Sequence, residues 1–277
     1  MPDSHAAPDG GVFRTIRAKG VNLRVFSVCE GRSGVPMVIC NGLGQAVEIL
    51  YPLMHEFPDR PIITFDAAGV GRSDVPGTDT TIPQHAAMLR QVLDELAIGE
   101  CDVMGISWGG ALAQQLAHDH PQLVRKLVLA ITSAGGIGSW WGTPLALAEI
   151  MFPMRYVNKT YGDFIGPFMY GGEAMLQPAL FRQYAKHAIR PSYEGYSAQV
   201  RALCSWTSLP WLARLQQPTQ VIGGALDTLI PVANQIALAA LVPKSRIKIY
   251  QAGHLLMYSR RTEVGALITG FLDEPSA

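Results

Sequence analysis

The sequence alternates short apolar runs with segments of helical spacing, and this alternation restricts the fold more than any other feature. Apolar runs at Pro36–Cys40, Pro61–Phe65 and Cys101–Ile106 have the length of buried strands. Amphipathic stretches at Ile82–Leu96 and Trp108–His120 follow two of these runs. Repeated strand–helix units of this length are typical of a mostly parallel sheet with helices on both faces.

The same pattern continues toward both ends of the chain. Val21–Val28 alternates as a strand does and is expected to pair with Phe13–Ala18. Further strands are expected at Lys126–Ile131, Thr219–Gly223 and Arg246–Gln251, and further helices at Gln45–Phe57, Val232–Leu241 and Thr262–Leu272. We therefore predict an α/β fold with an eight-stranded, mostly parallel sheet.

The alternation stops between Gly135 and about Leu215, where short helical pieces are separated by glycine and proline. Fourteen of the 23 aromatic residues lie between Trp140 and Trp211, which suits an apolar wall over a binding site, although part of this set is expected to form the insertion's own core. We accordingly predict a disordered tail at 1–11, a core at 12–135 and 216–277, and a helical cap at 136–215.

The charge balance argues against a polyanionic partner. Lys+Arg and Asp+Glu number 22 each, so the chain has no general attraction to nucleic acids or anionic membranes. No run approaches the roughly 20 apolar residues of a membrane span. The first residues also lack the basic start and apolar run of a secretory signal. We expect a cytoplasmic protein that has no transmembrane segment and does not bind nucleic acid.

The four cysteines do not form a metal motif. None of them makes a Cys-x-x-Cys pair, and no histidine cluster lies beside them, so structural zinc is not expected. Cys29, Cys40 and Cys101 lie in or beside apolar strand-like runs and are predicted to be buried free thiols. The predicted chemistry below requires neither a metal nor an organic cofactor.

The run Gly105-Ile106-Ser107-Trp108-Gly109 carries the sharpest chemical signal. A Gly-x-Ser-x-Gly motif between a strand and a helix places its serine on a tight, strained turn with the hydroxyl exposed above the sheet. Side chains at positions 105 and 109 are expected to collide with neighbouring backbone. The Trp108 N–H would then face the site and stabilise a developing oxyanion.

A serine hydroxyl is a weak nucleophile unless a base removes its proton, and a carboxylate must orient that base. His254 directly follows the strand at Arg246–Gln251, at the edge where catalytic groups gather in such sheets. Asp227 is the only carboxylate in the loop after Thr219–Gly223. We therefore predict Ser107, Asp227 and His254 as nucleophile, acid and base.

Two other loops bear on the same site. Asp66 and Asp74 also follow a strand, but their Gly- and Ser-rich context indicates a turn network rather than the catalytic acid. The loop Asn41-Gly42-Leu43-Gly44 follows the first buried strand, where a second oxyanion donor is expected. We predict the Leu43 N–H as that donor, with Asn41 holding the loop.

These motifs resemble those of intracellular medium-chain-length poly(3-hydroxyalkanoate) depolymerases. The matching stretches are Gly105–Pro121, Lys126–Gly135, Tyr170–Gly172, Trp206–Leu212, Gln216–Thr219 and Asp227–Pro231. The resemblance runs from about Phe13 to Leu272 and implies a capped α/β-hydrolase that cleaves medium-chain 3-hydroxyacyl polyesters. Positions with acidic residues in that family carry Ala225, Leu226, Gln251 and Ala252 here, which changes the charge near the site.

The resemblance leaves several activities open. The first is cleavage of medium-chain poly(3-hydroxyalkanoate) or its oligomers through an acyl-enzyme. The others are general carboxylesterase or thioesterase activity on medium-chain acyl substrates and 3-hydroxyacyl transfer. Association with intracellular polyester granules and the oligomeric state also stay open. The predicted substrate contacts are Asn41, Trp140, Trp141, Met169 and Trp206.

Overall fold

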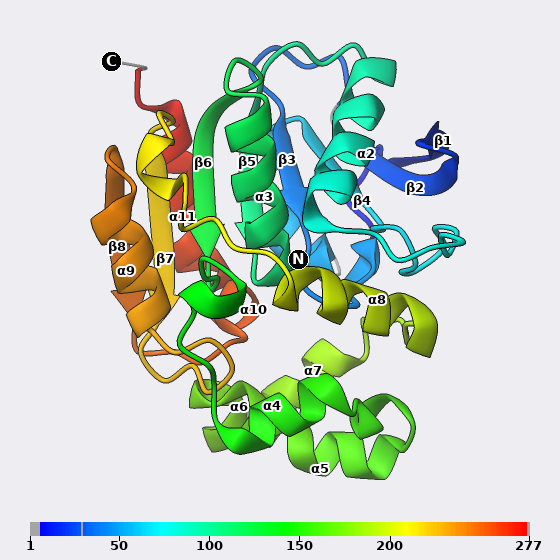
Figure 1. The fold of residues 1–277 in the computed structure, drawn as a ribbon, viewed down its shortest axis with the longest axis vertical. Helices are drawn as coiled ribbons and strands as arrows, with labels where there is room; N and C mark the ends of the chain where they lie inside the picture. Colours follow the sequence, from blue (N-terminus) through cyan, green and yellow to red (C-terminus); the bar gives the residue numbers. More distant parts are fainter. Residues whose placement is uncertain (1–5, 29, 276–277) are drawn as a thin grey trace.

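A computed structural model of the protein describes residues 6–28 and 30–275. Eight strands form one sheet in the order β1-β2-β4-β3-β5-β6-β7-β8 (Figure 1). The strands are β1 (Val12–Ala18), β2 (Val21–Val28), β3 (Met37–Cys40), β4 (Ile62–Phe65), β5 (Cys101–Ile106), β6 (Val124–Ala130), β7 (Thr219–Gly224) and β8 (Ser245–Tyr250). Strand β2 is antiparallel to both β1 and β4, and all other pairs are parallel. The predicted α/β fold with a mostly parallel eight-stranded sheet is confirmed.

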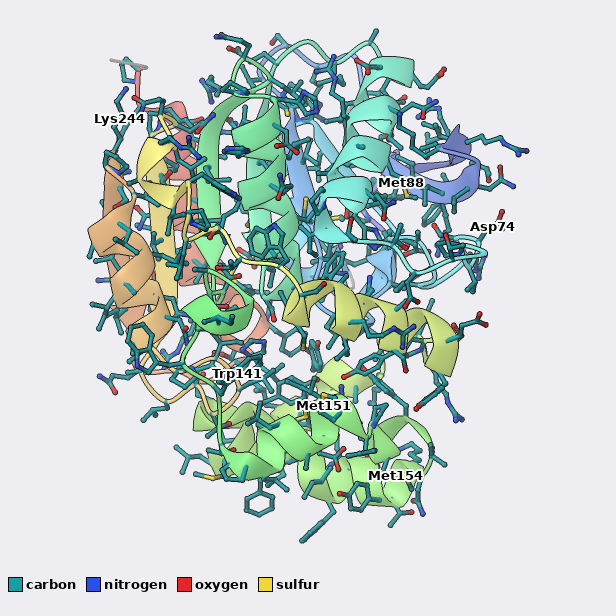
Figure 2. The ribbon with its side chains drawn as sticks, in the orientation of Figure 1. Asp74, Met88, Trp141, Met151, Met154 and Lys244 are labelled. Carbon is teal, nitrogen blue, oxygen red and sulfur yellow. The ribbon has the colours of Figure 1, made fainter. Side chains whose placement is uncertain are left out.

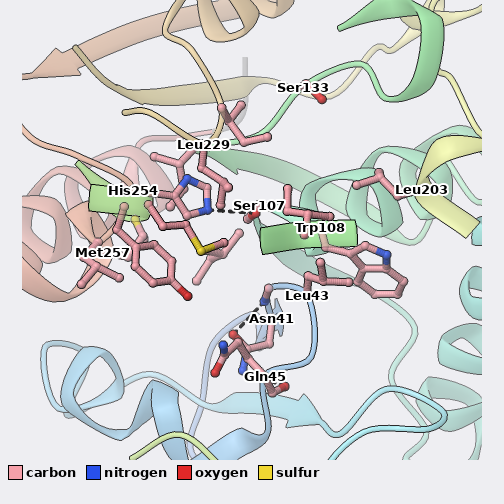
Figure 3. A pocket seen from close by; sticks show the side chains of 18 of the residues that line it. Asn41, Leu43, Gln45, Ser107, Trp108, Ser133, Leu203, Leu229, His254 and Met257 are labelled. Atoms are coloured by element: carbon pink, nitrogen blue, oxygen red, sulfur yellow. Dashed lines mark hydrogen bonds between the residues drawn. The ribbon is translucent and has the colours of Figure 1, made fainter. Parts of the chain in front are cut away.

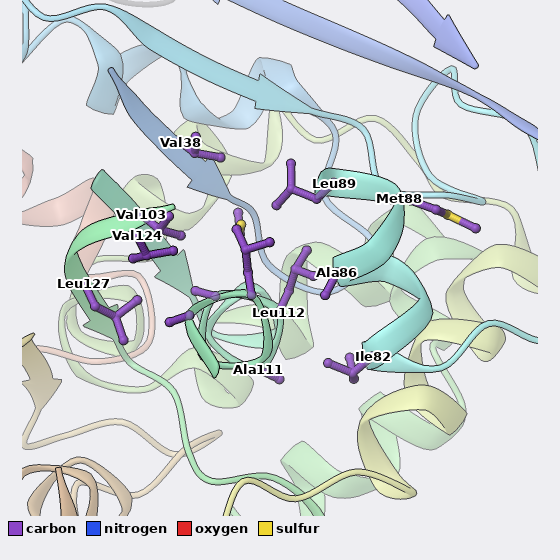
Figure 4. Close-up of a cluster of buried hydrophobic side chains, with 14 of the residues drawn as sticks. Val38, Ile82, Ala86, Met88, Leu89, Val103, Ala111, Leu112, Val124 and Leu127 are labelled. Carbon is purple, nitrogen blue, oxygen red and sulfur yellow. The ribbon is translucent and has the colours of Figure 1, made fainter. Parts of the chain in front are cut away.

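Helices cover both faces of the sheet. Figure 4 shows α2 (Ile82–Glu95) and α3 (Trp108–Asp119) packing Leu89 and Leu112 toward Val38 and Val103 of the sheet. Helix α9 (Ala233–Leu241) joins the same core through Leu238. The opposite core is closed by η1 (Val47–Leu50), α1 (Tyr51–Met54), α10 (Leu256–Ser259) and α11 (Arg261–Asp273).

The predicted helix at Gln45–Phe57 is wrong in its extent. The segment forms the 3₁₀ turn η1 and the short helix α1 instead. Pro52 lacks the N–H that would continue a helical hydrogen-bond ladder from η1 into α1, so one continuous helix does not form. The Val47 amide, at the start of η1, donates to the Asp66 carboxylate at 2.8 Å. Asp66 also accepts from the Arg72 amide at 2.9 Å, which agrees with the predicted turn network.

A layer of short helices lies at the carboxyl ends of the parallel strands (Figure 1). It contains η2 (Gly136–Gly138), α4 (Pro144–Met151), η3 (Met154–Tyr156), α5 (Lys159–Tyr170), α6 (Gly172–Leu176), α7 (Pro178–Ala185) and α8 (Tyr193–Cys204). The turn η4 (Leu212–Arg214) lies instead at the other edge of the sheet, just before β7 (Figure 1). Trp141, Met151 and Met154 are each about half exposed on this layer (Figure 2). No helix in the described chain is long and apolar enough to cross a membrane.

Parts of the earlier predictions concern undescribed residues. Positions 1–5 of the predicted tail and Cys29 lie outside the described ranges. Within the described part, the Ala6 carbonyl lies 3.1 Å from His55 Nε2. Cys40 and Cys101 are buried free thiols, and burial raises the pKa of both.

Helix α3 approaches the sheet so closely that two of its neighbouring positions admit only glycine. A Cβ at Gly109 would lie 2.1 Å from the Cys40 carbonyl oxygen, and one at Gly105 would lie 2.5 Å from the Gly109 oxygen. Both distances are far inside van der Waals contact. This close packing fixes where the chain between β5 and α3 must turn.

We predict that Gly109→Ala destabilises the protein, because the added methyl group meets rigid backbone rather than a flexible side chain. The expected cost is about 1–3 kcal/mol in the free energy of unfolding. Gly270→Ala is the matched control, since Gly270 lies in helix α11 with nothing within 4 Å of an added Cβ. That change should stabilise the helix by about 0.5–1 kcal/mol. Urea unfolding measures both, and equal effects of the two substitutions would contradict the close approach.

Candidate active site

Ser107 lies at the turn between β5 and α3 in a left-handed backbone conformation, with φ of 53° and ψ of −118°. Such a conformation costs a residue other than glycine about 1–3 kcal/mol and persists only where its surroundings enforce it. The Ser107 amide donates to the Ala130 carbonyl at 2.9 Å, and its own carbonyl accepts from Gly110 N–H at 2.8 Å and Thr132 Oγ1 at 2.6 Å. These bonds hold the strained turn.

The three side chains predicted as a triad are joined by two hydrogen bonds, and Figure 3 shows the one between His254 and Ser107. His254 Nε2 lies 3.1 Å from Ser107 Oγ, and His254 Nδ1 lies 2.7 Å from Asp227 Oδ2. Asp227 Oδ1 accepts from the Leu229 and Ile230 amides at 2.8 Å each. Because the Asp227 carboxylate accepts a hydrogen bond from Nδ1–H, the Nε2 atom carries no proton and can accept the serine proton.

The end of α5 holds the loops that carry the acid and the base. The His254 amide donates to the Tyr170 carbonyl at 2.8 Å, and the Thr228 hydroxyl donates to the Met169 carbonyl at 2.6 Å. A Cβ at Gly172 would lie 2.1 Å from Gly253 N, so the backbone of the helical layer rests directly on the histidine loop. The helical layer therefore positions the line of three side chains.

The loop after β3 lies beside Ser107, where the predicted oxyanion donors must be. A Cβ built at Gly42 would be 3.8 Å from Ser107 Cβ. Asn41 holds this loop, because its Oδ1 accepts from Gly42 N–H and its Nδ2 donates to the Ala46 carbonyl at 2.9 Å. Within the described chain, the backbone amides of Leu43 and Trp108 donate to no protein acceptor.

Gln199 in α8 was not identified from the sequence, yet it ties both oxyanion segments together. Its Oε1 accepts from Gly44 N–H at 2.8 Å, and its backbone carbonyl accepts from Trp108 Nε1 at 3.0 Å. The side chain is almost fully buried. A lone glutamine in an amphipathic stretch has no sequence signal of such a role, because its partners are 91 and 155 residues away.

A largely apolar pocket of about 140 Å³ opens over Ser107 and His254 (Figure 3). Four of the residues predicted to contact substrate line it, namely Asn41, Trp140, Trp141 and Met169. Its other apolar lining includes Ile49, Leu50, Leu53, Ile131, Leu147, Ile150, Val200, Leu203, Leu229, Leu255 and Met257. The pocket thus offers an apolar acyl group a place beside a serine hydroxyl and two amide donors.

Trp206 lies elsewhere and does not reach this pocket in the structure. Its indole N–H donates to Gln115 Oε1 at 2.6 Å, and its ring stands at 6.0 Å from that of Trp211. The ring also covers Gly135, where a Cβ would lie 2.4 Å from it. The residue therefore packs the helical layer on α3, and the predicted substrate contact by Trp206 has no support in this arrangement.

The described residues offer no cluster of three or more histidine, cysteine or acidic side chains able to hold a metal ion. The groups at the site that can take part in a reaction are the Ser107 hydroxyl, the His254 imidazole, the Asp227 carboxylate and the free backbone amides.

Residues 35–260 match the family described as alpha/beta hydrolase fold. The chain belongs to this family. It is 38% identical over 269 residues to a poly(3-hydroxyalkanoate) depolymerase of Ectopseudomonas oleovorans, covering 96% of this chain and 94% of that protein. It is 26% identical to a 2-hydroxymuconate semialdehyde hydrolase of Pseudomonas sp. (strain CF600), covering 96% of this chain and 95% of that one.

Solved structures share the fold of this α/β-hydrolase. The enol-lactonase of Burkholderia xenovorans LB400 superposes with a TM-score of 0.81 at 22% identity, covering 94% of this chain and all of that one. A hydrolase of Pseudomonas aeruginosa PA01 gives the same TM-score and identity, with coverage of 95% and 98%. At this level of identity the likeness shows the fold alone.

We predict that a fluorophosphonate probe labels Ser107, because His254 can accept the hydroxyl proton. His254→Ala should slow labelling by about 10²–10⁴-fold. Ser133→Ala is the matched control, since Ser133 lines the same pocket but bonds to the Ser139 hydroxyl at 2.8 Å instead of an imidazole. Peptide mass spectrometry locates the label, and a label on another serine would refute the assignment.

Proposed function

We propose that this α/β-hydrolase cleaves the ester bonds of medium-chain poly(3-hydroxyalkanoate) or its oligomers through an acyl-enzyme on Ser107. The observation that carries the proposal is the hydrogen-bonded line from Asp227 through His254 to Ser107 at the floor of an apolar pocket. The 38% identity to a poly(3-hydroxyalkanoate) depolymerase supports the choice of polyester as substrate.

In the proposed cycle, His254 takes the Ser107 proton as the oxygen attacks the ester carbonyl. The Leu43 and Trp108 amides bind the oxyanion, and Asp227 stabilises the charged imidazole. His254 then gives the proton to the leaving alcohol. Water, activated by the same imidazole, hydrolyses the acyl-serine and restores the free hydroxyl.

The helices between residues 136 and 215 would act as the cap over this site, and the acyl side chain would lie among the pocket's apolar residues. Burying one methylene group contributes about 0.8 kcal/mol. Granule association and a cytoplasmic location stay predictions from the sequence.

The first test is loss of turbidity from a suspension of medium-chain poly(3-hydroxyalkanoate), with identification of the released hydroxyacids. The wild-type chain should clear the suspension. Ser107→Ala should reduce clearing by several orders of magnitude without changing the unfolding curve, because the acyl-serine cannot form. Hydrolysis of soluble p-nitrophenyl esters or thioesters without polymer clearing would replace the proposal by a general esterase or thioesterase. Products heavier than a hydroxyacyl thioester substrate would indicate acyl transfer.

A second prediction concerns chain length. Because each buried methylene contributes about 0.8 kcal/mol, kcat/KM for p-nitrophenyl esters should rise about fourfold for each added methylene until the pocket is filled. Steady-state kinetics from acetyl to decanoyl esters measures the slope. A constant or falling kcat/KM from acetyl to hexanoyl would show that the apolar residues do not receive the acyl chain.

A further inference from the structure

Arg155 in η3 lines the same pocket as Ser107 and His254. Among the described residues that line this pocket, it is the one side chain with a permanent charge, and no carboxylate lines it. The arginine side chain is only 7% exposed. A buried cation is costly unless oppositely charged or hydrogen-bonding groups match it, so its place beside a hydrolytic site requires a physical reason.

The protein satisfies this guanidinium only in part. Arg155 donates from Nη1 to the Glu149 carbonyl and from Nη2 to the Tyr196 hydroxyl, the latter at 3.0 Å, while its buried Nε has no partner. The facing Glu149 carboxylate is 3.8 Å from Nη1, and its Oε1 already accepts from the Tyr161 hydroxyl. Because a guanidinium has five N–H donors, Arg155 retains capacity for a further acceptor.

Glu149 is the one buried counter-ion of Arg155 among the described residues, and the other polar groups around the arginine include phenols. Burial raises the pKa of Tyr170 and Tyr184, so both phenols stay neutral. Burial opposes the charged form of Arg155, yet the net shift of its pKa is upward. The guanidinium therefore keeps its positive charge, as arginine does in proteins generally.

The surroundings beyond Arg155 are also basic. Gln45, Arg155, Tyr170 and Tyr184 wall a second cavity as well as the catalytic pocket. The other charged residues of that cavity are Lys159, Asp163, Arg182, Lys186 and Arg190. Lys159 pairs with Asp163 at 2.6 Å, which leaves an excess of positive charge. Such a lining favours an anionic group near this end of the catalytic pocket.

We propose that Arg155 binds the free carboxylate of a linear hydroxyacyl oligomer, so that such oligomers are better substrates than neutral esters of the same length. This inference rests on the ester hydrolysis proposed above. In a linear hydroxyacid oligomer, every ester bond has the free carboxylate on its alcohol side. The carboxylate at Arg155 therefore belongs to the leaving group and not to the acyl group on Ser107.

The bond changes follow from this orientation. Ser107 Oγ bonds to the ester carbonyl carbon, the bond from that carbon to the alcohol oxygen breaks, and His254 gives its proton to the departing oxygen. The fragment released first is a hydroxyacid anion at Arg155, and water then frees the acyl-serine as a second acid. The structure thus assigns the carboxyl-terminal fragment as the first product.

The test compares the linear dimer of 3-hydroxyoctanoate with the methyl ester of the same dimer. A charge-assisted hydrogen bond to the carboxylate should give the free acid a kcat/KM about 10- to 100-fold higher than that of the methyl ester. Most of this difference should come from a lower KM. Equal or lower kcat/KM for the free acid overturns the inference. If the enzyme hydrolyses neither dimer and does not hydrolyse p-nitrophenyl octanoate, the proposed ester hydrolysis itself is refuted.

Variants separate Arg155 from the other arginines of the helical layer. Arg155→Met should bring the ratio of kcat/KM for acid and methyl ester close to one, and Arg155→Lys should restore part of it. Arg201→Met is the matched control, because Arg201 lies in α8 and pairs with the exposed Asp79. It should keep the wild-type ratio, and an equal loss in both methionine variants would contradict a specific site.

A binding measurement tests the inference even if a variant misfolds or the enzyme does not turn over the dimers. Removing Arg155 alone leaves Glu149 buried without its cation, so Arg155→Met/Glu149→Gln serves as the charge-neutral companion. Calorimetry on Ser107→Ala should show 3-hydroxyoctanoate binding at least about tenfold more tightly than its neutral amide. The preference should vanish when the paired substitution is added, and equal binding of acid and amide to Ser107→Ala would overturn the inference.

Discussion

The geometry of the site depends on the strained turn that holds Ser107 between β5 and α3. Three backbone-directed hydrogen bonds and two glycine contacts enforce a φ of 53° that serine would not adopt alone. The turn brings the hydroxyl to 3.1 Å from His254 Nε2 and leaves the Trp108 amide without a protein acceptor. The positions of the proposed nucleophile and the proposed oxyanion donor are thus one consequence of how closely α3 packs on β3.

The helical layer completes this arrangement and does more than cover it. Tyr170 holds the histidine loop through its carbonyl, and Gln199 joins Gly44 to the indole of Trp108. Arg155 adds the one permanent charge among the described residues of a largely apolar pocket. Movement of this layer would therefore disturb the proposed base, the oxyanion loop and the proposed carboxylate contact together.

Local sequence patterns predicted most of the fold and the three residues of the line. Strand and helix periodicity located all eight strands, and loops at strand ends singled out Asp227 and His254, because parallel strands bring their ends to one edge. The helix at Gln45–Phe57 was predicted too long because Pro52, which has no N–H, interrupts the hydrogen-bond ladder between η1 and α1. Trp206 was assigned wrongly, and the roles of Gln199 and Arg155 were missed, because the contacts of all three residues lie on other elements, which periodicity does not reveal.

The central claim is that Ser107 forms a covalent acyl intermediate, and rapid acid quenching during turnover tests it most directly. Intact-mass measurement of enzyme quenched while hydrolysing a 3-hydroxyoctanoate oligomer should show a population heavier by the acyl group. Peptide analysis should place that group on the peptide containing Ser107, and Asp227→Asn should lower the amount formed during the first turnover. Turnover without any adduct, or an adduct on a different residue, would contradict the account.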